Sequence, residues 1–214
     1  MILALALVAA GTAYWLRAVF DGEGLVAANP AWVLIADFDN RTGEERFDGT
    51  LETALRRELA NSRHVLVVAP ERVSDTLILM KQTPSVPIDT DLGREICLRL
   101  GGVRAILTGW VEKFDSRYLL SLAVIDPSDG RMVASAEEMA TGESEVLPAL
   151  HSLGNWVRRN LGEELRHIEA SDEQLEQVTT PSLRALELYT RGIQILREDF
   201  WAHVKGIPEG KRSV

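Results

Sequence analysis

The first hundred residues alternate between short apolar runs and segments whose apolar residues recur at helical spacing. Residues 32–36 and 64–68 are continuous apolar runs, which are typical of strands buried on both faces. Residues 51–59 carry apolar side chains at the spacing of an amphipathic helix. A second helix, opened by a proline, is predicted over 70–81, and a third over 92–100, where a Gly-Gly pair stops it. The pattern predicts the order β-α-β-α-α.

Further along the chain, the pattern changes to that of an antiparallel meander. Three strands are predicted over 105–112, 118–125 and 132–138, with turn sequences at 115–116 and 127–130 between them. Because crossovers between parallel strands are right-handed and short, the first three strands of the chain are predicted to be parallel. We therefore expect an α/β fold: a mixed five-stranded sheet (three parallel strands plus two antiparallel hairpin strands) with packed helices.

A long amphipathic helix is predicted over 146–161, where a glycine ends it. The acidic segment 163–179 lacks a clear apolar face and is predicted to be a linker. The α/β domain is therefore expected to span 31–162.

The remaining segment, 180–214, is expected to form a single helix followed by a frayed end. Thr180 can cap this helix, and Pro181 suits its first turn. Its apolar face is predicted to consist of Leu183, Leu186, Tyr189, Ile193 and Leu196. From residue 200 onward the sequence shows no clean periodicity.

Residues 2–20 form an apolar segment that bears on membrane attachment. The segment is close to the length of about 20 residues that a membrane-spanning helix needs. Arg17 lies near one end, where its side chain can reach the interface. A cleaved signal peptide and a buried core helix are the alternatives, but no basic residues precede the apolar run. We expect a transmembrane or signal-anchor helix over 1–20 and a polar linker over 21–30.

The amino-acid composition excludes several classes of protein. The chain has 46% hydrophobic and 26% charged residues, as ordinary globular proteins do. Its net charge of −9 argues against a nucleic-acid partner, which would need clustered Lys and Arg. Cys97 is the only cysteine in the sequence, so no internal disulfide or cysteine-based zinc site can form. No cofactor is expected, and the sequence does not identify a small-molecule ligand.

The most specific enzymatic signal is a pair of aspartates after the first strand. Asp37 and Asp39 resemble the signature of haloacid-dehalogenase-type phosphatases, in which one Asp attacks phosphorus and the other handles a proton beside magnesium. Asp126 and Asp129 could stand for the later acidic pair. However, Arg41 occupies the position where the signature has Thr. We therefore assign no catalytic, cofactor-binding or metal-binding residue, and a periplasmic magnesium-dependent phosphatase using Asp37 and Asp39 is the alternative.

Several segments, taken in order, resemble the module similar to the amino-terminal domain of TolB. The first strand leads into an Asp-Phe-Asp-Asn sequence over 37–40, and Phe-Asp-Gly opens a helix at 47–49. Residues 100–109 resemble the strand entry of the family, and 123–130 resemble its hairpin. Residues 182–192 resemble the helix that begins a tetratricopeptide array. The family usually has Pro-Phe at the end of its first strand, where this chain has Ala-Asp-Phe.

The resemblance implies a binding role. Such modules follow the membrane helix of some bacterial receptor kinases, adenylate cyclases and CadC-like regulators, ahead of tetratricopeptide repeats. The resemblance therefore implies a non-catalytic interaction or sensory module within a larger bacterial signalling or scaffold protein. We expect a single-pass protein of the bacterial inner membrane, with its main domain in the periplasm and a protein as its partner.

Overall fold

The structure is a computed structural model. It describes residues 30–62, 64–163, 168 and 182–205, with side chains up to Leu196. The expected membrane helix over 1–20 and the linker that follows it lie outside the described residues. Within the described ranges, no helix is both long enough and apolar enough to cross a membrane.

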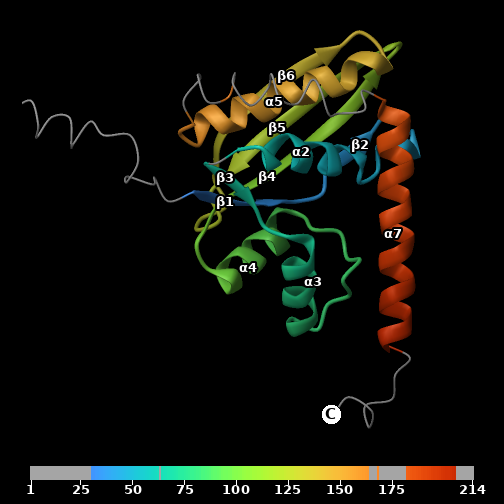
Figure 1. The fold of residues 1–214 in the computed structure, drawn as a ribbon. Helices are drawn as coiled ribbons and strands as arrows, with labels where there is room; N and C mark the ends of the chain where they lie inside the picture. The colour runs from blue at the N-terminus through green and yellow to red at the C-terminus, as the bar shows by residue number, and fades with distance from the viewer. Residues whose placement is uncertain (1–29, 63, 164–167, 169–181, 206–214) are drawn as a thin grey trace, which may run out of the picture. The chain divides into compact units, whose positions relative to one another are not determined.

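A mixed sheet forms the centre of the fold (Figure 1), and its strands follow the order β3-β1-β4-β5-β6. β1 pairs in parallel with both β3 and β4, whereas β4, β5 and β6 form an antiparallel meander. The three parallel strands and the two antiparallel hairpin strands expected from the sequence are thereby confirmed. The strands are β1 (Ala31–Ile35), β3 (Val65–Val67), β4 (Val103–Phe114), β5 (Arg117–Ile125) and β6 (Met132–Ala140).

A sixth strand corrects the expected count of five. β2 (Asp39–Arg41) pairs in parallel with β4 over Trp110 to Glu112, beyond the stretch of β4 that pairs with β1. β4 is 12 residues long, so its far half would lack a neighbour on that side without β2. All three residues of β2 are polar, and the apolar pattern therefore did not reveal it.

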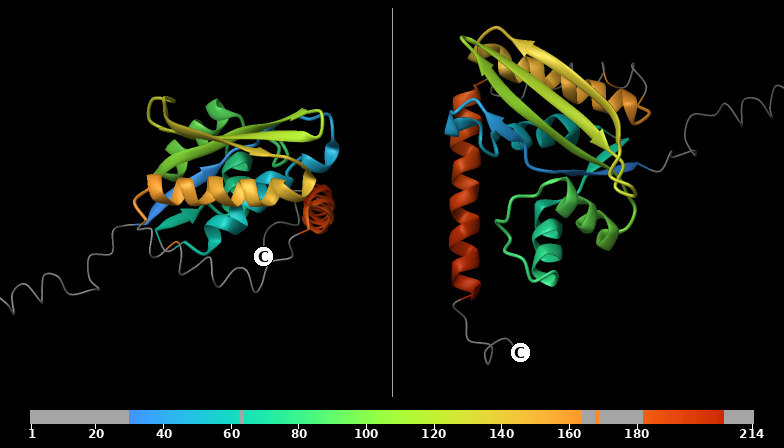
Figure 2. Two further views of the ribbon diagram at one scale, coloured as in Figure 1. Left: turned by 90° about the horizontal axis from the view of Figure 1, so that it is seen from above. Right: turned by 180° about the vertical axis from the view of Figure 1, so that it is seen from behind.

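Helices cover both faces of the sheet, as Figures 1 and 2 show. The structure describes five α-helices: α2 (Thr50–Ala60), α3 (Pro70–Leu79), α4 (Thr90–Leu100), α5 (Val146–Asn160) and α7 (Leu183–Lys205). Two short 3-10 helices, η1 (Glu45–Phe47) and η2 (Glu143–Glu145), precede α2 and α5.

Alternating residues of β1 point into two separate cores. Val33 and Ile35 pack with side chains of α2 and α5 in the larger core. Leu34 packs with side chains of α3 and α4, among them Ile96, in the smaller one. The chain therefore places α2 and α5 on one face of the sheet and α3 and α4 on the other. A continuous apolar run such as 32–36 is what a strand between two cores requires.

The first turns of α7 join the larger core, which the sequence did not predict. Leu183 and Leu186 are buried there, and the helix contacts α2 and η1. Tyr189 and Leu196, which were expected to share the apolar face with them, are instead exposed. Thr190, one turn after Leu186, is also buried, so this side of α7 faces the rest of the domain.

The carboxyl end of α7 also differs from the expectation. The expected cap, Thr180, and the first-turn Pro181 lie outside the described residues; the oxygen atoms of Ser182 accept hydrogen bonds from the amides of Ala185 and Leu186. The helix continues to Lys205, past residue 200, where fraying was expected. The described part of the expected linker consists of Glu163 and Ile168, and both are buried.

Candidate functional site

The chain between β1 and α2 holds the aspartates that the sequence singled out. Asp37 follows the end of β1 and is bound to the segment that precedes α4. Its Oδ2 atom accepts a hydrogen bond from the amide of Ile88 at 2.8 Å, and its own amide donates to the Ile88 carbonyl at 3.0 Å. Desolvation by the surrounding protein raises the pKa of Asp37, and the Ile88 hydrogen bond offsets part of that rise.

Asp39 has a different partner. It lies in β2 with its side chain exposed, and its Oδ2 atom is 2.7 Å from Nε of Arg41. The two carboxylates thus have different partners: that of Asp37 binds the segment before α4, and that of Asp39 binds a residue of its own strand. In the part of the chain that the structure describes, no group of three or more His, Cys, Asp or Glu residues could hold a metal ion.

The second acidic pair lies in the β5–β6 turn and organises that turn. Asp126 accepts hydrogen bonds from the amide and the hydroxyl of Ser128, at 2.8 and 2.7 Å. Asp129 accepts one from the amide of Arg131 at 2.9 Å. Asp126 extends β5 toward the amino end of β4, whereas Asp37 extends β1 toward the carboxyl end of β4. The structure therefore does not bring the two acidic pairs together.

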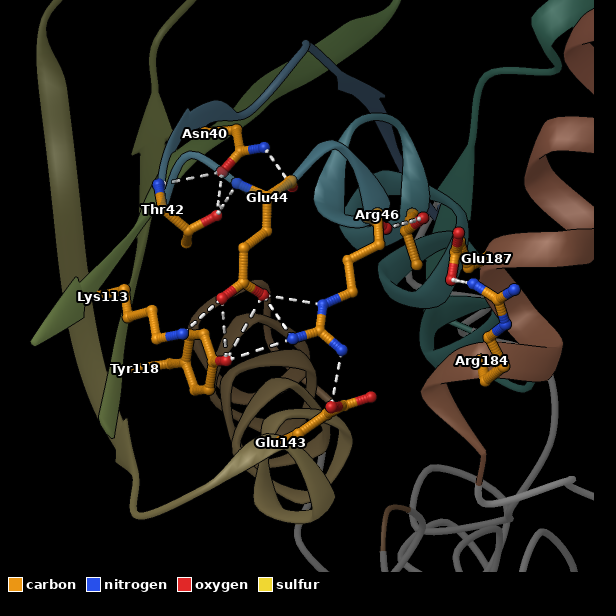
Figure 3. Close-up of polar contacts among 10 residues, drawn as sticks. Asn40, Thr42, Glu44, Arg46, Lys113, Tyr118, Glu143, Arg184 and Glu187 are labelled. Atoms are coloured by element: carbon orange, nitrogen blue, oxygen red, sulfur yellow. Dashed lines mark hydrogen bonds and ion pairs between the residues drawn. The ribbon is translucent and has the colours of Figure 1, made fainter. Parts of the chain in front are cut away.

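A polar network centred on Glu44 closes the β2–α2 loop against the sheet (Figure 3). Lys113 of β4 lies 2.5 Å from Oε1 of Glu44, and Arg46 pairs with Oε2. Arg46 also pairs with Glu143 of η2 at 2.6 Å, and the Tyr118 hydroxyl lies 3.4 Å from both Glu44 oxygens. Partial burial raises the pKa of Glu44, but the hydrogen bonds from Lys113 and Arg46 outweigh it and leave that pKa below its usual value.

Asn40 shapes the same loop from within. Its amide nitrogen donates to the Glu44 carbonyl at 2.9 Å and to Oδ1 of Asp48 at 2.7 Å. Its amide oxygen accepts from the backbone and the hydroxyl of Thr42. These four hydrogen bonds stabilise the conformation of the loop, so the Asn40 side chain has a structural role.

Glu52 is the least expected group near the end of β1. This residue of the first turn of α2 is buried, its Oε1 atom accepts a hydrogen bond from the Phe38 amide at 2.6 Å, and its Oε2 atom has no partner among the described residues. Burial raises the pKa of Glu52 to about 7, and Asp37 and Asp48 nearby add to the rise, against hydrogen bonds that lower it. Sequence reasoning missed Glu52, because an acidic residue in a first helical turn is usually exposed.

Exposed apolar side chains gather on α7. The α7 stripe consists of Leu188, Tyr189, Gly192, Ile195 and Leu196, which share one side of the helix through their spacing. Its four large side chains each expose between 49% and 70% of their surface. The guanidinium of Arg57 lies 5.0 Å from the centre of the Tyr189 ring and covers one edge of the stripe.

Comparison with known proteins yields structural neighbours only. No protein-family profile matches the chain, and no curated protein matches it. The chain is similar to the LpoB C-terminal domain from Salmonella enterica, with 16% identity over 57% of this chain and 89% of that chain, at a TM-score of 0.48. It is similar to lipoprotein GNA1162 from Neisseria meningitidis, with 14% identity over 61% and 99% of the two chains, at a TM-score of 0.42.

A TolB protein is also among these neighbours. TolB from Acinetobacter baumannii is 13% identical over 63% of this chain and 29% of that chain, at a TM-score of 0.41.

Proposed function

We propose that this chain is a non-catalytic, extracytoplasmic protein-interaction module. In this proposal residues 2–20 hold it in the bacterial inner membrane, and the chain belongs to a larger signalling or scaffold protein. The observation that carries the interaction role is the α7 stripe, because a contiguous exposed apolar patch marks a surface that another protein covers.

The contacts that hold α7 against the domain leave the α7 stripe exposed to solvent. Leu183 and Leu186 fix one side of the helix in the core. Further along, Thr190 and Gln194 lie against Gly49, whose φ of +69° lets the backbone turn into α2 at that point. Rotating the helix to bury Leu188 or Leu196 would withdraw Leu183 and Leu186 from the core. The stripe is therefore available to a partner without any rearrangement of the body.

The sequence resemblance suggests the kind of helical region to which α7 belongs. Residues 182–192 resemble the first helix of a tetratricopeptide array, and stacked repeats of this kind present an extended surface that binds other proteins. We propose that α7 begins such a helical region and that the stripe forms part of its protein-binding surface.

Two experiments in cells test this proposal. A photo-crosslinking amino acid at Leu196 is expected to capture a protein partner, whereas the same amino acid at Arg99, exposed on α4, is expected to capture none. Equal yields at the two positions would contradict the interaction role of the stripe.

The second experiment tests the compartment. A cysteine replaces Ser116 in the exposed β4–β5 turn, and the buried Cys97 is changed to Ser. A membrane-impermeant maleimide should label this cysteine once the outer membrane is opened. Labelling that requires rupture of the inner membrane would place the domain in the cytoplasm and refute an extracytoplasmic location.

A further inference from the structure

β6 forms an edge of the sheet. It pairs with β5 along Tyr118 to Ile125 on one side, and in the described part of the chain no strand pairs with its other side. Figure 1 shows β6 at the border of the sheet.

The register identifies which backbone groups of β6 point away from β5. The β4–β5 turn has two residues, and Asp115 in it has a φ of +56°. In such a hairpin the closing pair, Phe114 and Arg117, is hydrogen-bonded. The N–H and C=O groups of Arg117 therefore point toward β4. Because this direction alternates from one residue to the next, the backbone groups of Tyr118, Leu120 and Leu122 point toward β6.

The partners of these three residues on β6 are Ala140, Glu138 and Ala136. The N–H and C=O groups of the residues between them, Glu137 and Met139, and of Ser135 before them therefore point outward. They form a row of donors and acceptors that only another extended strand can satisfy in order.

This edge lacks two of the usual protections against strand addition. Its nine residues include no lysine and no proline, the residues that most often block sheet edges. Val133 and Met139 expose 62% and 47% of their side chains on the sheet face beside it. An added strand would thus gain apolar contact as well as backbone hydrogen bonds.

The charges of β6 favour a basic strand over a second copy. Glu137 and Glu138 are exposed on opposite faces of β6, and neither has an ion-pair partner among the described residues. The chain itself carries a net charge of −9. A second copy would bring two more glutamates to the same edge, whereas lysine or arginine side chains would pair with those already there.

We propose that the outer edge of β6 binds an extended peptide, of alternating basic and apolar residues, as an added strand of the sheet. This rests on the proposed interaction role but uses a different surface from the α7 stripe. Backbone pairing supplies affinity; Glu138 on one face of β6 selects the basic side chains of the peptide, and Met139 on the other face selects the apolar ones.

The test uses the full chain in detergent micelles and fluorescein-labelled peptides of nine residues, the length of β6. One peptide alternates lysine and valine, a second alternates glutamate and valine, and a third is the lysine peptide with an N-methyl group on every amide, so that the amides facing β6 are included whichever way the peptide runs. We expect the lysine peptide to bind, and the other two to bind about tenfold more weakly or worse. N-methylation removes donors without changing charge, so equal binding of the methylated peptide would overturn the proposal.

Variants locate the binding edge. Ser135→Pro removes an outward-facing donor and places a ring on the edge, so it should abolish binding, whereas Ser135→Thr should change it by about twofold or less. The double variant Glu137→Lys, Glu138→Lys should reverse the preference between the lysine and glutamate peptides. Unchanged binding in Ser135→Pro would overturn the proposal, as would concentration-dependent self-association of the chain that Ser135→Pro removes. Neither result bears on the crosslink at Leu196, so failure here leaves the α7 proposal standing.

Discussion

Arg158 and Glu163 form a two-point ion pair that is sealed from water. Nε and Nη2 of Arg158 lie 2.9 and 2.8 Å from the two carboxylate oxygens of Glu163, and the two side chains expose 1% and 2% of their surfaces. The hydroxyl of Ser62 also donates to Glu163, while its oxygen accepts from the Val65 amide. The pair therefore ties the end of α5 to the loop between α2 and β3.

Removal of this carboxylate should be strongly destabilising. We expect Glu163→Gln to lower the free energy of unfolding by about 3–5 kcal/mol, because it removes the carboxylate charge that pairs with the buried Arg158 guanidinium. Glu95→Gln, in an exposed pair with Arg99 on α4, is the matched control and should cost about 0.5 kcal/mol or less. Urea unfolding of both variants measures the difference, and equal costs would contradict the structural role of the buried pair.

Glu52 should give the protein an unusual pH dependence. Its folded-state pKa of about 7 lies above the ordinary value of 4.5, so the folded state binds this proton more tightly than the unfolded chain does. The resulting stability is present below about pH 4.5 and is lost as the pH rises through 7. Relative to Glu52→Gln, the wild-type chain should lose about 3 kcal/mol between pH 4 and pH 8. A constant difference between the two proteins across that range would show that Glu52 does not titrate this way.

Gly109 should not tolerate a side chain. A Cβ atom there would lie 2.1 Å from the Ser121 carbonyl oxygen and 2.7 Å from the ring of Phe38. Because one obstacle is backbone, we expect Gly109→Ala to cost about 1–3 kcal/mol. Gly142→Ala is the control, since nothing lies within 4 Å of its Cβ position and its φ is −175°. Thermal unfolding compares the two, and a neutral Gly109→Ala would mean that β4 and β5 separate at little cost.

The two sides of α7 should respond differently to substitution. Leu186→Ala opens a cavity in the larger core and should cost about 2–5 kcal/mol. Tyr189→Glu, on the stripe, loses its contact with Arg57 and should cost about 1 kcal/mol or less. Chemical unfolding separates these values. If Tyr189→Glu destabilised the domain as much as Leu186→Ala does, the stripe would have to be covered within the chain itself.

Substitution of Asp37 tests the alternative that the protein is a phosphatase. If the chain is non-catalytic, Asp37→Asn should leave any phosphate release with magnesium unchanged, because the carboxylate serves Ile88 and not a substrate. The variant keeps an oxygen that can accept from the Ile88 amide, so we expect a stability change of about 1 kcal/mol or less. Magnesium-dependent phosphate release that disappears in this variant would place the protein among the enzymes.

The sequence predicted those parts of the fold in which apolar residues determine the structure. Continuous apolar runs predicted β1 and β3, and the turn sequences at 115–116 and 127–130 predicted where the strands of the meander begin and end. β2 was missed because its pairing depends on the length of β4 and not on its own residues.

The polar features could not be predicted for a related reason. Glu52 and Glu163 are acidic residues in segments where acids are usually exposed, and only tertiary contacts decide that they are buried. The network around Glu44 joins a loop to residues some seventy positions away. The side of α7 that faces the core depends likewise on where α2 and η1 lie.

The central position of β1 has a consequence for the time at which the domain can fold. Leu34 pairs with Ile106, 72 residues later in the chain, so β1 is made early while one of its two neighbours is made late. At about 5–20 residues per second, roughly 4–14 s pass before β4 emerges, whether from the ribosome or on the far side of a membrane. Throughout that interval the apolar residues Val33, Leu34 and Ile35 lack the strand that covers one of their two sides in the folded domain. We therefore expect the newborn chain to depend on a chaperone that shields this one segment.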